Sequence, residues 1–170
     1  MADAELRALA ERLQGLCLGR RLTVAVAESC TGGLVAAALT EIAGSSGYFL
    51  GGIVSYSNAA KVGFLDVPEA TLAAHGAVSA QVARAMAVGA RARFGATISA
   101  SVTGIAGPDG GTDEKPVGLT YVGLAGDGRA DVHRAVWGGD RASNRRDSAI
   151  EVLRLLVAWA EATPPDGVRE

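Results

Sequence analysis

TVAVAESCTGG, residues 23–33, decides the fold, because this stretch passes from a short apolar strand directly into the helix-forming sequence LVAAALTEI. The first N–H groups of such a helix have no partners within it and point at whatever lies over the turn. Ser29 lies in this turn, where its hydroxyl is a helix cap, a nucleophile beside free N–H donors, or part of a phosphate cradle. The spacing matches neither a P-loop nor a G-x-S-x-G elbow.

The rest of the chain alternates between helical and strand patterns, with recognisable starts and stops. Ser79 is expected to cap a long helix that Gly95 ends, and Gly126-Asp127-Gly128 is expected to turn a hairpin. The predicted helices are about Asp3–Cys17, Gly32–Ile42, a short one after Asn58, one beginning at Pro68, Ala80–Phe94 and about Asp140–Ala162; the predicted strands are Thr23–Glu28, Gly51–Ser57, Ala96–Thr103, Leu119–Ala125 and Asp131–Trp137. This order predicts the α/β class, as a layered α/β/α domain around a mixed sheet.

Length and composition narrow the class of protein. The 170 residues fit a single domain, 1–170, with a frayed tail over about 163–170. A net charge of -2, with acidic and basic residues interspersed, predicts neither nucleic acid nor a membrane as a partner. Cys17 and Cys30 lack C-x-x-C spacing, which predicts two buried thiols and no metal site. The chain shows no secretory signal and no spanning segment, so we expect a cytoplasmic protein, and its apolar helix faces leave room for a homodimer.

A nucleophilic Ser29 needs a base, and the two histidines are poor candidates for it. His75 lies beside a glycine at a predicted helix end, and His133 lies in a predicted hairpin strand. The workable alternative is a lysine whose pKa is lowered by burial. The chain holds only Lys61 and Lys115.

Lys61 is the better placed of the two lysines. It follows Tyr56, Ser57 and Asn58 at the end of an apolar strand, and ligand sites in open α/β sheets form at strand ends. Lys61 is therefore the candidate base, with a solvated surface lysine as the alternative. Whether its strand end lies beside that of Ser29 does not follow from the pattern.

Two further segments are candidates for binding. The glycine-rich stretch from Thr103 and Gly104 to Gly118 is either a cradle for a phosphate or polar substrate, or a flexible surface loop. Arg141 and Arg145 begin the last predicted helix, where a positive charge opposes the helix dipole. A substrate phosphate would explain these arginines, and salt bridges to nearby aspartates would explain them almost as well.

Several motifs in order resemble a known family. They are AESCTGG (27–33), AGSSGYF (43–49), YSNAAK (56–61), HGAVS (75–79), TGIAGPDGG (103–111), EKPVG (114–118) and GDR (139–141) followed by Arg145. This set resembles the CinA C-terminal domain family, whose characterised members are nicotinamide-nucleotide amidohydrolases of the PncC type. The resemblance runs from about Leu6 to Ala162, and the chain is similar to the stand-alone form.

The resemblance implies hydrolysis of the carboxamide of nicotinamide mononucleotide to nicotinate mononucleotide and ammonia, without metal or cofactor. It implies Ser29 as nucleophile, Lys61 as general base, and Tyr56 lining or assisting the site. Oxyanion or substrate contacts are expected from Cys30, Thr31, Gly32, Gly33, Asn58, Thr103, Gly104, Arg141 and Arg145. The rival hypothesis is a non-catalytic nucleotide-binding or regulatory module that uses the Ser29 turn as an anion cradle.

Overall fold

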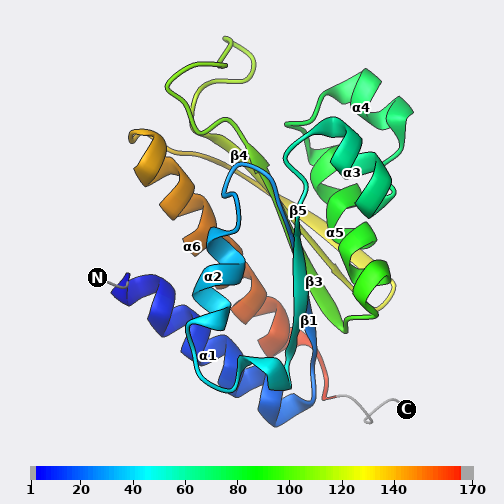
Figure 1. Ribbon diagram of the computed structural model, residues 1–170, viewed down its shortest axis with the longest axis vertical. Helices are drawn as coiled ribbons and strands as arrows, with labels where there is room; N and C mark the ends of the chain where they lie inside the picture. The colour runs from blue at the N-terminus through cyan, green and yellow to red at the C-terminus, as the bar shows by residue number, and fades with distance from the viewer. Residues whose placement is uncertain (1–2, 166–170) are drawn as a thin grey trace.

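A computed structural model describes residues 3–165, which form a five-stranded mixed sheet between two layers of helices (Figure 1). The strands are β1 (Val24–Glu28), β2 (Phe49–Val54), β3 (Ile98–Gly104), β4 (Leu119–Gly126) and β5 (Arg129–Val136), in the spatial order β2-β1-β3-β4-β5. β2, β1 and β3 are parallel, whereas β4 and β5 pair as an antiparallel hairpin and β4 is antiparallel to β3. The predicted α/β fold with a mixed sheet is confirmed. Of the tail predicted to fray, residues 166–170 lie outside the described residues.

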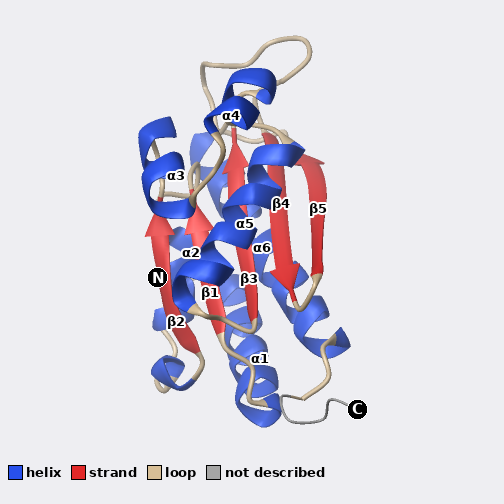
Figure 2. Ribbon diagram, turned by 90° about the vertical axis from the view of Figure 1, so that its right-hand side faces the viewer, coloured by secondary structure: helices blue, strands red, loops and turns tan. Residues whose placement is uncertain are grey.

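Helices cover both faces of the sheet. One layer consists of α1 (Ala4–Arg20), α2 (Leu34–Thr40) and α6 (Arg141–Ala162). The other consists of α3 (Asn58–Leu65), α4 (Glu69–His75) and α5 (Ala80–Phe94), and Figure 2 shows α5 crossing in front of the strands. A single 3-10 turn, η1 (Ser45–Gly47), precedes β2. Within residues 3–165, no helix is both long and apolar enough to cross a membrane.

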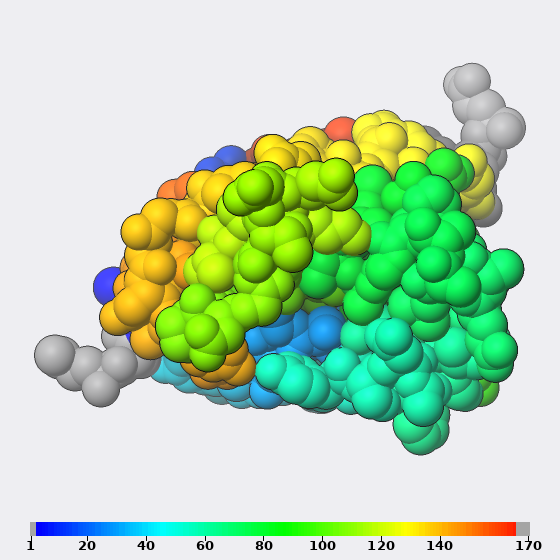
Figure 3. Space-filling view, turned by 90° about the horizontal axis from the view of Figure 1, so that it is seen from above, coloured from blue at the N-terminus to red at the C-terminus, as the bar shows by residue number. Residues whose placement is uncertain are grey.

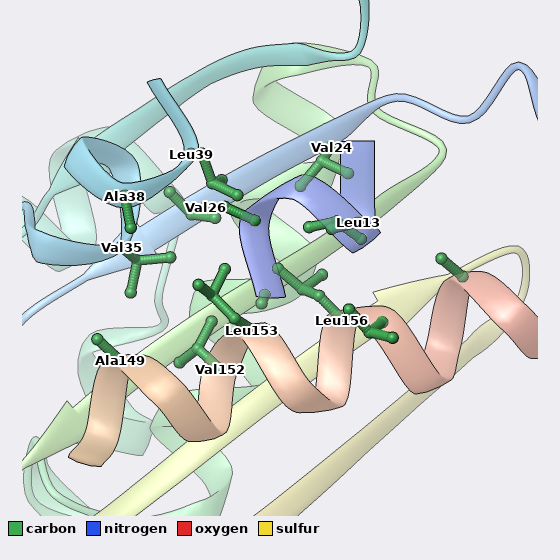
Figure 4. Close-up of a cluster of buried hydrophobic side chains, with 14 of the residues drawn as sticks. Leu13, Val24, Val26, Val35, Ala38, Leu39, Ala149, Val152, Leu153 and Leu156 are labelled. Atoms are coloured by element: carbon green, nitrogen blue, oxygen red, sulfur yellow. The ribbon is translucent and has the colours of Figure 1, made fainter. Parts of the chain in front are cut away.

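The larger hydrophobic core fills the space between the sheet and the α1, α2 and α6 layer (Figure 4). Leu13, Val26, Leu39, Leu153 and Leu156 come from four different elements and are almost completely buried there. Each such side chain contributes about 1.5–3 kcal/mol through burial alone. Packing in this core fixes the position of β1 relative to the helices, and therefore also the position of the turn that follows β1.

A smaller core lies under α5 and fixes the position of α3. Val82 and Met86 of α5 pack there with Leu65 at the end of α3. A Cβ at Gly89 would lie 1.9 Å from the carbonyl oxygen of Leu65, so only glycine permits this approach of α3 to α5. The close contact sets the place of Lys61, which lies one turn before Leu65 in α3.

The predicted boundaries hold where a capping residue marks them. α5 has the predicted bounds, with Ser79 accepting from the Val82 N–H and Gly95 in the left-handed conformation. α2 begins later than predicted, because Gly32 and Gly33 have φ of 61° and 102°, which no right-handed helix contains. The predicted second strand was placed about two residues late, since Phe49 already pairs with Val24.

The carboxyl ends of β1, β2 and β3 meet at one edge of the sheet, as the arrows in Figure 2 show. Figure 3 looks onto this edge. The blue atoms of the β1–α2 turn lie at the bottom of a hollow between the loop 105–118, in lime, and the teal segment after β2. The topology therefore gathers the predicted site segments at one place.

Candidate active site

The β1–α2 turn and α3 bring Ser29 and Lys61 into direct contact. Ser29 follows the last residue of β1, and its N–H continues the sheet by donating to the carbonyl of Val102 at 2.9 Å. Lys61 lies on α3, and its Nζ donates to Ser29 Oγ at 3.0 Å. Two elements that are distant in the sequence thus form a hydroxyl–amine pair.

Main-chain oxygens hold the amine of Lys61 in place. Nζ also donates to the carbonyl oxygen of Ser55 at 2.6 Å and to that of Tyr56 at 3.4 Å. Only 1% of the surface of Lys61 is exposed, and no ion pair within residues 3–165 includes it. Burial lowers the pKa of Lys61 below its ordinary value of 10.5, with the Cys30 thiol acting weakly in the opposite direction. A lysine in this environment is suited to accept a proton.

Glu28, the residue before the serine, is buried and caps the following helix. Its Oε2 accepts from Thr31 Oγ1 at 2.6 Å, from Gly33 N–H at 2.9 Å and from Val35 N–H at 3.2 Å. Its Oε1 accepts from the Ala36 N–H at 2.8 Å. The protein therefore supplies its own anion to the N-terminus of α2, and the anion cradle considered from the sequence is already filled by this carboxylate.

The donors left for an oxyanion are fewer than predicted. The N–H of Gly33 is bound by Glu28, and the N–H of Gly32 donates to the Ser29 carbonyl at 3.1 Å. Among the described residues, the N–H groups of Cys30 and Thr31 find no oxygen acceptor, although both residues are buried. Buried N–H groups without an oxygen partner are rare, so these two are the candidate oxyanion donors of the turn.

The thiol of Cys30 lies near these two donors. Burial raises the pKa of Cys30 to about 11, and the N–H groups of Cys30 and Thr31 act on the thiol in the opposite direction. Both donors therefore lie close to Cys30 Sγ, and Cys30 is one of the residues that line the hollow above Ser29. The two N–H groups are therefore near the thiol that lines the cleft.

A cleft of about 300 Å³ opens above the Ser29–Lys61 pair, in the size range of small-ligand sites. Its walls come from the β1–α2 turn, the segment after β2, the start of α6 and the loop 105–118. The lining residues are Ser29, Cys30, Tyr56, Lys61, Ala77, Val78, Thr103, Gly104, Ile105, Ala106, Gly107, Asp109, Gly110 and Arg141. Thr103 and Gly104, predicted to begin the glycine-rich loop, are the last two residues of β3 and line the cleft.

Arg141 lies at the mouth of this cleft. It donates to the carbonyl of Gly107 at 2.8 Å and to the hydroxyl of Tyr56 at 3.3 Å. These bonds join α6, the loop 105–118 and the segment after β2. Tyr56 itself is 62% exposed, so its ring is an open wall of the cleft. Arg141 is exposed too, and is the cation nearest to solvent among the lining residues.

Arg145 does not line the cleft, in contrast to the expected substrate contact. Its Nε donates to the Cys30 carbonyl at 3.2 Å and its Nη2 to the Thr31 carbonyl at 2.8 Å. Asn58 is also absent from the lining; it is the exposed first residue of α3. The alternative explanation, a salt bridge from Arg141 or Arg145 to Asp140 or Asp147, is not found within residues 3–165, where Arg146 pairs with Asp147.

One residue of the site region has no signal in the sequence. Asn144 is buried in α6, where its Nδ2 donates to the Ala106 carbonyl at 3.0 Å and its Oδ1 accepts from the Gly139 N–H. It therefore holds the cleft loop against α6. A lone polar residue in a segment of mixed polarity gives no periodic pattern, so only the fold reveals it.

Neither histidine lines the cleft. His75 ends α4 and its carbonyl accepts from Lys115 Nζ at 2.6 Å, while His133 is exposed on β5. Within residues 3–165, no group of three or more His, Cys, Asp or Glu side chains is arranged to hold a metal ion. Ser29 and Lys61 are the candidate reactive pair of the cleft.

Comparison with known proteins places the chain in a family. The sequence model of the CinA C-terminal domain matches residues 6–159. The chain belongs to this family. It is 52% identical over 160 residues to a CinA-like protein of Citrifermentans bemidjiense and 59% identical over 149 residues to one of Geobacter sp.. The aligned region covers 92% and 88% of this chain, but only 39% and 36% of those CinA-like relatives. The chain thus spans less than half the length of these curated relatives.

Solved structures of the CinA superfamily share the whole fold. The competence/damage inducible protein CihA from Agrobacterium tumefaciens matches with a TM-score of 0.90 at 42% identity, over 93% of this chain and 97% of that one. A CinA superfamily protein from Klebsiella pneumoniae matches with a TM-score of 0.89 at 30% identity, over 93% and 99% of the two chains. These names state a family and no reaction, so the chemistry has to be inferred from the site.

Proposed function

We propose that this CinA domain is an amidohydrolase that converts nicotinamide mononucleotide to nicotinate mononucleotide and ammonia. The observation that carries the proposal is the 3.0 Å hydrogen bond between Lys61 Nζ and Ser29 Oγ. The lysine is buried without a carboxylate partner among the described residues, which favours its neutral form. A serine activated by a neutral lysine is a known arrangement for acyl transfer.

The proposed reaction uses each of these groups in turn. Neutral Lys61 takes the proton of Ser29 Oγ as that oxygen bonds to the carboxamide carbon, and the carbonyl π pair moves onto oxygen. The N–H groups of Cys30 and Thr31 are the proposed donors to this oxyanion. Lys61 then gives its proton to the amide nitrogen as the C–N bond breaks, so ammonia leaves and an ester remains on Ser29.

Water completes the cycle. It loses a proton to Lys61 as its oxygen bonds to the ester carbon, and collapse of the second tetrahedral species breaks the bond to Ser29 Oγ. Lys61 returns the proton to Oγ. The net reaction consumes one carboxamide and one water and yields one carboxylic acid and one ammonia. No step requires a redox change.

The family resemblance and the cleft together support the proposed substrate. The volume of about 300 Å³ admits a pyridine ring and part of a nucleotide. The exposed ring of Tyr56 offers a surface on which a pyridine can stack. Arg141 keeps donors beyond its bonds to Gly107 and Tyr56, and a guanidinium at the mouth suits a phosphate. We therefore assign the phosphate to Arg141 and not to Arg145.

A nucleotide-binding module without catalysis has less support. That hypothesis used the N-terminus of α2 as an anion cradle, and Glu28 occupies those N–H groups. A binding module also has no need of a lysine buried against a serine, since that burial costs free energy. The pair of Ser29 and Lys61 is therefore better explained as reactive machinery.

Ammonia release from nicotinamide mononucleotide by metal-stripped protein tests the proposal. Ser29→Ala and Lys61→Ala should each lower the rate by about 10³-fold or more while the protein stays folded. Ser46→Ala, on the exposed η1 turn, is the matched control and should leave the rate unchanged. Binding of the nucleotide without any ammonia release by the wild type would reject the amidohydrolase and favour the binding module.

The same assay tests the assigned phosphate contact. Arg141→Gln should raise KM by about tenfold or more, because a charge-assisted hydrogen bond is worth about 1.5–3 kcal/mol. With nicotinamide riboside, which lacks the phosphate, wild type and variant should have similar kcat/KM. An equal loss on both substrates would show that Arg141 does not bind the phosphate.

A further inference from the structure

Arg145 contacts the main chain of the nucleophile turn and nothing else among the hydrogen bonds of the described residues. Its guanidinium reaches from the first turns of α6 to the carbonyls of the two residues that directly follow Ser29. The guanidinium is half-buried and forms no ion pair within residues 3–165. Among the described residues, the only hydrogen bonds of this charged side chain go to two neutral carbonyls, which suggests that Arg145 serves to fix the orientation of those carbonyls.

Peptide geometry links these carbonyls to the candidate oxyanion donors. In a trans peptide the C=O of one residue and the N–H of the next point in opposite directions. Because Arg145 holds the Cys30 carbonyl on the α6 side, the Thr31 N–H must point away from α6. The Ser29 carbonyl accepts from the Gly32 N–H at 3.1 Å, and this bond in turn directs the Cys30 N–H outward.

We propose that Arg145 is a positioning residue that fixes the Cys30–Thr31 peptide so that the Thr31 N–H is preorganised to receive the oxyanion; this role rests on the proposed amidohydrolase function. Arginine suits the task because its planar fork donates to both carbonyls at once. A hydrogen bond to a carbonyl also polarises its peptide, which makes the N–H of that peptide a stronger donor.

The opposite side of the turn is held by Glu28. Thr31 is bound from both directions, since its hydroxyl donates to Glu28 and its carbonyl accepts from Arg145. Gly32 lies between these contacts, and a Cβ there would come within 3.5 Å of Arg145 Nη2. An acid and a base that bind different atoms of one residue leave the peptide little freedom to rotate.

The alternative role for Arg145 is the substrate contact expected from the sequence. The two roles predict different kinetics. A residue that acts on the oxyanion stabilises the transition state only, so its loss lowers kcat and leaves KM nearly unchanged. A residue that binds the phosphate of the substrate mainly changes KM.

Arg145→Gln and Arg145→Lys separate the two roles, with Arg154→Gln as a matched control. Arg154 lies on the same helix, where it is exposed and pairs with Glu5. Loss of one oxyanion donor costs about 10²–10³-fold in kcat, so Arg145→Gln should lower kcat by about 10²-fold with KM within about threefold. Arg145→Lys should lower kcat by a smaller factor, because its ammonium group can still donate to one of the two carbonyls. The pH midpoint set by Lys61 should stay the same in both.

A raised KM with an unchanged kcat would overturn the inference and restore the substrate contact. Phosphonylation of Ser29 by a fluorophosphonate supplies a readout that does not need amidase activity, because the attacked phosphorus also places an oxygen in the oxyanion position. Arg145→Gln should slow this labelling by about the factor seen in kcat. If wild type releases no ammonia yet labels faster than the variant, the proposed function fails and the positioning role stands. Equal labelling rates would reject the positioning role.

Discussion

Replacement of Glu28 by glutamine should destabilise the protein more than any loss of a surface charge. The carboxylate accepts four hydrogen bonds, three at Oε2 and one at Oε1, and 1% of the residue is exposed. Glutamine keeps one acceptor oxygen and directs an NH₂ group at the remaining donor. With the oxygen at the Oε2 position, the NH₂ faces the Ala36 N–H, so two donors oppose each other.

The size of the effect can be worked from these contacts. Loss of one hydrogen bond to a charged group costs about 1.5–3 kcal/mol, and loss of the negative charge at the N-terminus of α2 costs about 0.3–2 kcal/mol more. Relief of burying the charge offsets part of this sum. We expect Glu28→Gln to lower the free energy of unfolding by about 3 kcal/mol, and the melting temperature by about 6–12 °C.

Urea denaturation and thermal melting followed by circular dichroism measure the two quantities. Glu69→Gln is the matched control, because Glu69 also lies in the first turn of a helix but is exposed. It should change the free energy of unfolding by less than about 0.5 kcal/mol. A Glu28→Gln variant as stable as this control would refute the inference that the carboxylate organises the turn.

The buried groups of the site give further expectations. Lys61→Met should abolish ammonia release yet raise the free energy of unfolding by about 1–2 kcal/mol at neutral pH, since methionine has no amine that must be desolvated or lose its proton on folding. Burial lowers the pKa of Lys61, so the folded state binds this proton more weakly than the unfolded chain. The stability of the wild type therefore rises with pH between the lowered pKa and 10.5. Over that interval the stability advantage of Lys61→Met shrinks. Urea titrations across that range test this, and an advantage that grows with pH would contradict it. The wild-type kcat/KM should likewise rise with pH through the lowered pKa, whereas a flat profile into acid would reject Lys61 as base. Because burial raises the pKa of Cys30 to about 11, iodoacetamide should modify it slowly in the folded protein and rapidly in urea, and fast labelling of the folded state would show the thiol to be accessible.

The sequence was most informative where a local signal coincides with a structural boundary. Ser79 and Gly95 delimit α5 because a hydroxyl cap and a left-handed glycine act within one turn of the chain. The hairpin of β4 and β5 followed from the glycines around Asp127, although its two-residue turn is tighter than predicted. Such signals need no knowledge of the rest of the fold.

The sequence identified Ser29 and Lys61 as candidate residues but did not show that they are in contact. Ser29 and Lys61 were each predicted at a strand end, and their contact depends on β2 being the neighbour of β1. Strand order is set by the packing of the whole sheet, which the pattern of a single segment does not contain.

The roles of Glu28 and Arg145 near Ser29 could not be predicted from local sequence patterns. Glu28 reads as the polar end of a strand, yet two left-handed glycines turn the chain so that its carboxylate reaches the N-terminus of α2. Arg145 reads as a phosphate ligand because it opposes the dipole of α6, but the three-dimensional fold places two carbonyls within its reach. Both assignments depend on where one backbone passes another.

The measurement that tests the central claim most directly is detection of the acyl-enzyme. Wild type is mixed with nicotinamide mononucleotide, quenched in acid during turnover, digested and analysed by mass spectrometry. The Ser/Lys mechanism predicts the nicotinate mononucleotide ester on the peptide that carries Ser29, and no ester in Lys61→Met. Ammonia release at the wild-type rate by Ser29→Ala, with no ester on any peptide of the wild type, would contradict it and would mean that water attacks the amide directly.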